Sequence, residues 1–222
     1  IDVSDPDRPR LGAALKLRHA IARLAQAGDF LVASAGQAGG LSILRLDSSA
    51  ALTEVGRIED PLVITGIVET GSGRFAMAPG QGIVRLAAVD NADWARSELV
   101  YPLPDVTDLV AGPAARLVAS EARGAFATAK LHVLATDGAT LRLQQRIAME
   151  ANWAGNLTTV GADLYVGLDG GKWMDSKWVR LSPLERWRFD AGGLSLQART
   201  DPAVYGNCYV VGDKVYVGVG AG

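Results

Sequence analysis

One strand pattern recurs five times along the 222-residue chain, and this repetition limits the possible folds more than any other feature. Each copy is a turn of small residues followed by a short alternating strand. The copies are Gly28–Ala33, Gly73–Ala78, Ala115–Ala119, Gly161–Gly167 and Gly212–Gly218, and successive copies start 42 to 51 residues apart. A period of this length is typical of architectures in which each repeat is one supersecondary unit.

Three further strands accompany each copy. A small, apolar strand precedes the turn, as in Val106–Gly112. Two strands follow, as in Leu131–Ala135 and Leu141–Ile147. The third strand of the fourth unit is expected to be long, Trp178–Phe189, and the fourth strand of the first unit is expected at Leu52–Ile58. No segment shows a helical period over ten residues or more. The Ala/Leu/Arg-rich stretch 13–27 falls in the repeat frame as an outer strand followed by an inner strand. Four strands per unit at this spacing predict an all-β fold, a β-propeller of about five four-stranded blades.

The ends of the chain predict how the ring is completed. The last unit stops after two strands, whereas residues 1–17 have the pattern of a third and a fourth strand. We therefore expect the N-terminal strands (1–17) to pair with the C-terminal strands (203–222), because closure removes unpaired sheet edges. The alternative is that the chain is a piece of a six- or seven-bladed propeller. The expected single domain, 1–222, has blades at approximately 18–58, 62–103, 105–148, 154–200, and 203–222 plus 1–17.

A family resemblance rests on the first nine residues, I-D-V-S-D-P-D-R-P. This stretch resembles the LVIVD-type bacterial propeller repeat, in which a strand ends in a D-V-S-D-P-x-x-P turn. Aspartate and serine bond the local backbone in such a turn, and proline fixes φ. The other blades keep only remnants, at 46–49 and 89–92. The resemblance implies a periplasmic, envelope-associated or secreted bacterial protein, and it brings no shared catalytic residues.

Charge and composition exclude several partners. The formal net charge is -2, and the 22 basic and 24 acidic residues are interspersed, which argues against nucleic-acid binding. No apolar run reaches the roughly 20 residues that span a bilayer. The single cysteine, Cys208, allows no internal disulfide. Hence we expect neither a nucleic-acid partner nor a membrane span.

A candidate metal site follows from the repeat itself. His19, Asp60, Asp105, Glu150 and Asp201 each stand just before an inner strand. Repeat symmetry places these loops on one face, where the four carboxylates would converge and favour a cation such as calcium. The competing interpretation is that they are ordinary turn residues bonding local backbone. Without this ion, we expect no cofactor.

A second candidate site is rich in aromatic and basic residues. The residues expected to contact a partner are Trp153, Lys172, Trp173, Met174 and Lys177. Tryptophan is enriched in binding hot spots. We expect Trp173 to lie in an extended connection between the second and third strands of its blade. Trp178 and Trp187, in contrast, are expected to pack between neighbouring blades.

The catalytic inventory is poor, which favours binding over catalysis. His132 has the pattern of a strand-face residue, and Cys208 that of a small buried hydrophobe. The preferred hypothesis is a non-enzymatic scaffold that binds a protein partner. Two alternatives stay open: a metal-dependent hydrolase resembling lactonases, and a lectin-like propeller that binds carbohydrate through tryptophans. Fold alone does not choose among them.

Overall fold

The computed structural model is all-β. It describes residues 8, 14–21, 23–27, 29–35, 40–47, 51–58, 64–89, 93–123, 127–174, 177–181, 183–200, 208–211 and 214–217. No helix occurs among them, so no helix in this part of the chain could cross a membrane. Residues 14–20 form no helix, and β1 begins only at Arg23.

Four antiparallel four-stranded sheets follow one another along the chain. Sheet 1 contains β1 (Arg23–Ala27), β2 (Phe30–Ser34), β3 (Leu41–Leu46) and β4 (Leu52–Ile58). Sheet 2 contains β5 (Gly66–Thr70), β6 (Gly73–Ala78), β7 (Gly82–Val89) and β8 (Asp93–Pro102). Sheet 3 contains β9 (Val106–Gly112), β10 (Arg116–Glu121), β11 (Lys130–Asp137) and β12 (Thr140–Ala148). Sheet 4 contains β13 (Trp153–Val160), β14 (Asp163–Met174), β16 (Leu184–Asp190) and β17 (Gly193–Arg199).

Two smaller elements complete the described fold. A strand β15 (Lys177–Leu181) pairs with the far half of β14, outside the order of sheet 4. The strands β18 (Cys208–Val211) and β19 (Lys214–Val217) form a separate hairpin that lies against β13 and β14.

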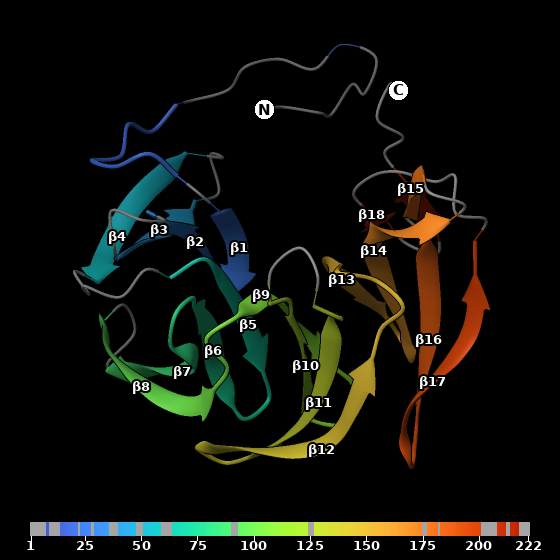
Figure 1. Ribbon diagram of the computed structural model, residues 1–222. Helices are drawn as coiled ribbons and strands as arrows, with labels where there is room; N and C mark the ends of the chain where they lie inside the picture. Colours follow the sequence, from blue (N-terminus) through green and yellow to red (C-terminus); the bar gives the residue numbers. More distant parts are fainter. Residues whose placement is uncertain are drawn as a thin grey trace.

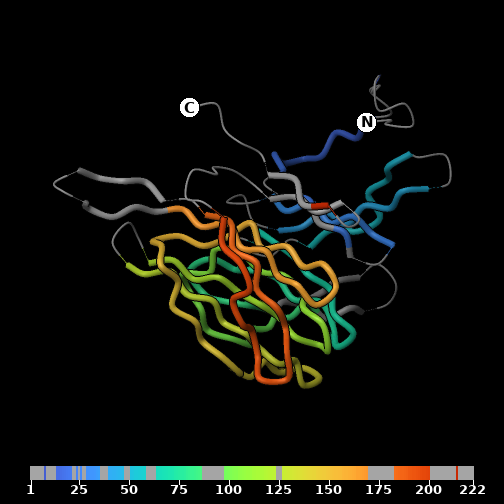
Figure 2. The backbone as a smooth tube through the Cα atoms, turned by 90° about the vertical axis from the view of Figure 1, so that its right-hand side faces the viewer, coloured from blue at the N-terminus to red at the C-terminus, as the bar shows by residue number. Residues whose placement is uncertain are grey.

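The sheets stand around a common axis, as Figure 1 shows face-on and Figure 2 from the side. Their first strands, β1, β5, β9 and β13, contact one another in that order and form the inner wall, and β18 contacts β13. The last strands, β4, β8, β12 and β17, contact one another at the periphery. This radial arrangement is that of a β-propeller, so the predicted fold class is confirmed.

Each pair of neighbouring sheets encloses its own hydrophobic core. Strands send alternate residues to opposite faces, so a middle sheet contributes to two cores. In β6, for example, Ala76 faces sheet 1 and Phe75 faces sheet 3. Phe75 is fully buried, and burial of such a side chain stabilises the fold by about 1.5–3 kcal/mol. Trp187 packs in the core between sheets 3 and 4, which confirms its expected place between blades.

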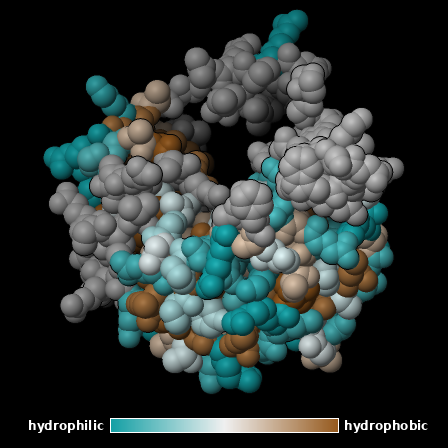
Figure 3. Space-filling model, viewed as in Figure 1, coloured by the Kyte–Doolittle hydropathy of each residue, from teal (hydrophilic) through white to brown (hydrophobic). Residues whose placement is uncertain are grey.

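The outer surface lacks a broad apolar patch on the face shown in Figure 3, where hydrophobic and hydrophilic residues are interspersed. Of the seven large exposed apolar side chains among the described residues, Leu15 and Ile21 precede sheet 1, and the other five are distributed over the four sheets. They include Leu46 in sheet 1, Leu99 in sheet 2, Leu143 in sheet 3 and Leu196 in sheet 4. Single exposed apolar residues of this kind are normal on protein surfaces and need no partner to explain them.

Two strand predictions were wrong. A long third strand was expected from Trp178 to Phe189, but the structure divides it into β15 and β16, because β14 runs past the sheet and takes β15 as a separate partner. An outer strand was also expected to reach Leu17, yet residues 14–20 form no strand. The remainder of the expected closing segment, 1–13, lies outside the described residues apart from Arg8, and so does most of 203–222, so closure stays a prediction.

Candidate functional site: the loop-bearing edge

Among the described residues, the connections from β8 to β9, from β10 to β11 and from β12 to β13 meet at one edge of the propeller, which we call the loop-bearing edge. Backbone hydrogen bonds join these connections. Ala122 N donates to Asp105 O at 3.1 Å, and Ala129 N donates to Ala151 O at 2.8 Å. The edge is thus a continuous surface built from loops on rigid sheets, a common location for binding residues.

A buried polar cluster lies beneath this edge between sheets 2 and 3. His132 on β11 is only 1% exposed and Glu121, at the end of β10, is 4% exposed. The Nε2 atom of His132 lies 2.8 Å from Glu121 Oε2, and its Nδ1 lies 3.2 Å from the Tyr101 hydroxyl on β8. With Glu121 as acceptor, His132 donates its Nε2 proton and accepts the Tyr101 hydroxyl proton at Nδ1. The histidine therefore joins two neighbouring sheets.

Arginine connects this cluster to the surface. Arg123 Nε lies 2.6 Å from Glu121 Oε1 and 3.0 Å from Asp105 Oδ2. The Arg123–Glu121 contact is a charge pair rather than a hydrogen bond. The buried Oε1 atom of Glu121 accepts no hydrogen bond from the described residues, so no N–H of Arg123 is aligned with it. Arg123 is itself largely exposed. The buried carboxylate is thus neutralised from the loop-bearing edge.

The cluster shifts both of its titrating groups downward. Burial lowers the pKa of His132, and the hydrogen bond to Glu121 opposes this only in part. Burial acts to raise the pKa of Glu121, but the hydrogen bond from His132 and the charge of Arg123 outweigh it, so this pKa lies below its usual value. Near pH 7 the pair is consequently a carboxylate beside a neutral imidazole.

A second buried polar cluster lies between sheets 3 and 4. Glu185 on β16 is 0% exposed. It accepts a hydrogen bond from Trp187 Nε1 at 2.9 Å and another from Arg199 Nε at 2.7 Å. Arg199 also donates to Glu150 at 2.7 Å, in the connection between sheets 3 and 4. The pKa of Arg199 is raised, chiefly by its hydrogen bond to Glu150 and next by its hydrogen bond to Glu185, although burial acts to lower it.

Two of the residues expected to bind a metal ion form ion pairs with arginines instead. Asp105 pairs with Arg123, and Glu150, whose side chain is 78% exposed, pairs with Arg199. Asp60 and Asp201 lie outside the described residues, and His19 is exposed. Within the described part of the chain, no three His, Cys, Asp or Glu side chains are placed to hold a metal ion.

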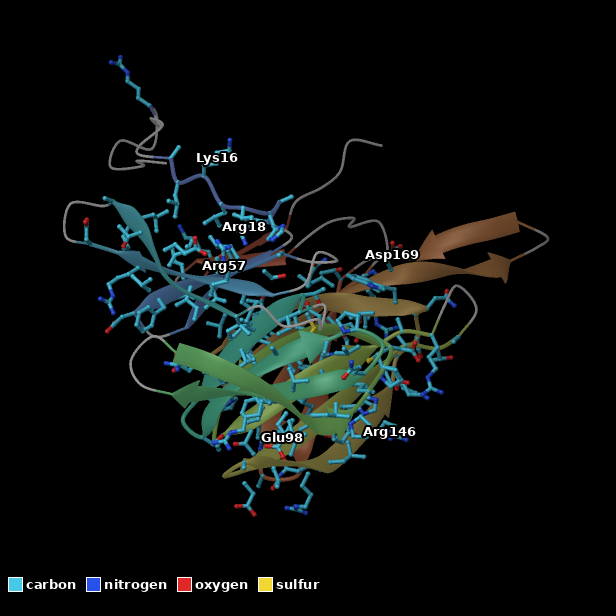
Figure 4. All side chains as sticks on the ribbon, turned by 90° about the vertical axis from the view of Figure 1, so that its left-hand side faces the viewer. Lys16, Arg18, Arg57, Glu98, Arg146 and Asp169 are labelled. Carbon is cyan, nitrogen blue, oxygen red and sulfur yellow. The ribbon has the colours of Figure 1, made fainter. Side chains whose placement is uncertain are left out.

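The aromatic and basic stretch forms a two-stranded arm. Trp173 was expected in a connection, but it is a strand residue of β14 that pairs with Trp178 of β15. Lys172 pairs with Val179, and Met174 pairs with Lys177. We call the ladder Gly170–Met174 with Lys177–Leu181 the arm. It extends from sheet 4 beyond Asp169, which Figure 4 labels at its base.

Trp153 lies beside the base of this arm. It is the first residue of β13 and pairs with Asp169 across the ladder. Its half-buried ring packs on Gly155, where any Cβ would collide with the indole. The next residue, Asn156, has a φ of 50° at a β-bulge, a conformation that asparagine tolerates better than most residues. The structure therefore brings Trp153 and the arm together, as the partner-site hypothesis requires.

Sequence reasoning missed the two buried clusters. Glu121 and Glu185 fall on the buried faces of their strands, and an acidic residue at a buried position needs a partner. That signal was present, and Arg123 stands only two residues from Glu121, whereas Arg199 meets Glu185 only through the register of β16 and β17. His132 was placed correctly on a strand face, whereas its bond to Tyr101 crosses between sheets.

Comparison with known proteins supports the fold. No protein-family model matches the chain, and no curated protein matches it. Two similar solved structures are candidate 6-phosphogluconolactonases, one from Bacteroides fragilis (TM-score 0.58) and one from Bacteroides uniformis (TM-score 0.57), each 14% identical in sequence. Each match covers 85% of this chain but only 59% of the other. At this identity the likeness concerns the propeller fold alone.

Proposed function

We propose that this chain is a non-enzymatic propeller that binds a protein partner at its loop-bearing edge, with the arm as the principal contact. The observation that carries the proposal is the length of β14, which continues past sheet 4 through Met174. In the described part of the chain, β15 pairs with β14 alone. Along its outer edges the arm pairs with no other described strand, so its backbone donors and acceptors there suit pairing with a partner strand.

The composition of the arm supports the same function. It contains Trp173 and Trp178, and tryptophan is the residue type most enriched in binding hot spots. Lys172, Lys177 and Arg180 outnumber acidic residues within its strands, which favours an acidic partner. The engagement of Asp105 and Glu150 by arginines favours binding over metal-dependent hydrolysis. The LVIVD-type resemblance adds an exported or envelope-associated setting to the proposal, which fractionation of source cells would test.

Shortening the arm tests this proposal without touching the sheets. Gly170 pairs with Leu181, so an Asn-Gly turn replacing residues 171–180 closes the hairpin at its base. Proteins captured from source extracts by the intact and shortened chains are compared by quantitative mass spectrometry, and the leading partner is then titrated with purified chains. Arg142→Ala, an exposed change on β12, is the matched control.

The expected result is a loss of at least about tenfold in affinity for the shortened chain and no change for the control. Trp173→Ala should reproduce most of that loss. Equal affinity of the intact and shortened chains would contradict the proposal.

A second candidate function is hydrolysis of a sugar lactone, which the names of the two structural neighbours favour. Purified chain incubated with 6-phosphogluconolactone, with and without added calcium, tests it directly by the rate of acid release. Hydrolysis at the spontaneous rate in both samples would exclude this candidate.

A further inference from the structure

The face of sheet 4 that points away from sheet 3 carries a depression of about 300 Å³. The residues that line it are Tyr165, Leu184, Arg186, Ala198, Arg199 and Thr200. Binding pockets for small molecules start at about this volume. The depression lies over β14, β16 and β17, whereas the hairpin β18–β19 contacts β13 and β14.

Small residues in the sheet create the hollow. Tyr165, Arg186 and Ala198 form one row across three strands, and Gly167 lies opposite Leu184 in the next row. Ala198, the smallest side chain that lines the depression, leaves space between Arg186 and Thr200. The rim is fixed because Leu184 N donates to Thr200 Oγ1 and Thr200 N donates to Leu184 O, both at 3.0 Å.

Two arginines on this face of β16 differ in their cross-strand partners. Arg188 lies opposite Asp163, and its Nε donates to the carboxylate at 2.9 Å. Arg186 lies opposite Tyr165 instead, and no carboxylate in the described part of the chain pairs with it. A guanidinium without a counter-charge at an apolar hollow attracts an anionic group, while the aliphatic and aromatic walls suit a ring.

The equivalent row of sheet 2 offers an internal comparison. There the pair is Phe75 and Arg85, and Phe75 is fully buried beneath sheet 3. In sheet 4 the corresponding Tyr165 and Arg186 are half-buried and exposed. The aromatic ring that is covered between sheets 2 and 3 is thus partly accessible on sheet 4, and its arginine partner is more exposed there than the half-buried Arg85.

We propose that this depression binds a small organic anion with a ring-shaped body, through Arg186 for the carboxylate or phosphate and through Tyr165, Leu184 and Ala198 for the ring. The site is separate from the arm, so its failure would leave the proposed partner binding unaffected.

Four probes separate charge from ring. Phenyl phosphate and benzoate have both features, benzyl alcohol has the ring alone, and inorganic phosphate has the charge alone. Each is titrated into ¹³C-methyl-labelled protein, and binding is followed at the Leu184 and Ala198 methyl signals. The expected Kd for the charged ring compounds is about 0.1–1 mM, with binding at least about tenfold weaker for the other two.

Variants of the two arginines locate the charge. Arg186→Gln should reduce the affinity for phenyl phosphate to that for benzyl alcohol, while Arg188→Gln, two residues away on the same face, should leave it unchanged. Four outcomes overturn the proposal: no shift at Leu184 and Ala198 at about 10 mM of either charged ring compound, equal binding of benzyl alcohol, equal binding of inorganic phosphate, or an affinity that Arg186→Gln does not alter. Unchanged dispersion of the variant's spectrum shows that it is folded.

Discussion

His132 in sheet 3 and Glu185 in sheet 4 occupy the same register position in neighbouring sheets. His132 lies opposite Ala119, and Glu185 lies opposite Val166, each on the third strand facing the preceding sheet. Both side chains are almost completely buried. The position thus carries an ionisable group in two consecutive blades, and the two blades stabilise that group differently.

The difference lies in what neutralises the buried charge. In sheet 3 the imidazole is neutral and joins Tyr101 to Glu121, whose charge Arg123 meets from the surface. In sheet 4 the carboxylate is held directly by Arg199. A buried ion pair loses most when one partner is removed, whereas a neutral hydrogen bond contributes about 1 kcal/mol. The sheet 4 cluster should therefore be the more sensitive to mutation, and the sheet 3 cluster the more sensitive to pH.

The largest effect is expected from Glu185→Ala. It removes the acceptor of both Trp187 Nε1 and Arg199 and leaves a cavity in the core between sheets 3 and 4. We expect a loss of about 3 kcal/mol in the free energy of unfolding, measured by urea denaturation. A loss below about 0.5 kcal/mol would show that the cluster does not stabilise sheet 4.

A smaller loss is expected from Tyr101→Phe. The change removes the hydroxyl that donates to His132 Nδ1 and keeps the ring in place. The expected destabilisation is about 1 kcal/mol in the same urea experiment. A neutral result would mean that the bond between sheets 2 and 3 is absent in solution.

The pH dependence distinguishes the two clusters further. The pKa of His132 is lowered in the folded state, so the unfolded chain binds the proton more readily. Stability is then fully present above the unfolded pKa of about 6.5 and falls as the pH decreases. The lowered pKa of Glu121 adds a second decrease below about 4.5. For the natural chain, the urea midpoint should fall as the pH decreases from 7.5 to 5. In His132→Gln the midpoint should change little over this range. A variant whose midpoint falls as steeply as that of the natural chain would refute the assignment.

The smallest effect is expected from Glu150→Gln. Glu150 is the exposed partner of Arg199, and exposed ion pairs contribute about 0–1 kcal/mol. The change in urea midpoint should lie near the error of the experiment and shrink further in added salt. A loss as large as that of Glu185→Ala would reverse the assigned roles of the two carboxylates.

Much of the fold could be predicted because the repeat is local. The bounds Val106–Gly112, Gly73–Ala78 and Leu52–Ile58 were identified from alternation and turn residues, and they coincide with strands of the structure. The arm was missed because Trp173 was expected in a connection, whereas β14 continues through Gly170 and Gly171 to Met174. Glycine has the same conformational freedom in a strand as in a turn, so sequence alone did not separate the two.

The candidate site was predicted less well, for a physical reason. Trp153 and Trp173 were selected by residue type, and the register brings Trp153 to the base of the arm. The engagement of Asp105 by Arg123 and of Glu150 by Arg199 could not be read from spacing. In the second pair, the fold brings a residue of the connection between sheets 3 and 4 beside a residue of β17 that lies 49 positions further along the chain. Contacts of that kind depend on how strands pair and sheets pack, which local patterns do not encode.

The comparison between the two clusters is tested most directly by ¹⁵N NMR of the His132 ring across a pH titration. At pH 7 we expect a neutral imidazole with its proton on Nε2, bonded to Glu121, and protonation only below the usual histidine pKa. A doubly protonated ring at pH 7 would contradict the neutral imidazole assigned to sheet 3, and a neutral ring with its proton on Nδ1 would contradict the hydrogen bond assigned to Glu121. Either result would remove the contrast with the arginine-bound carboxylate at the same position of sheet 4.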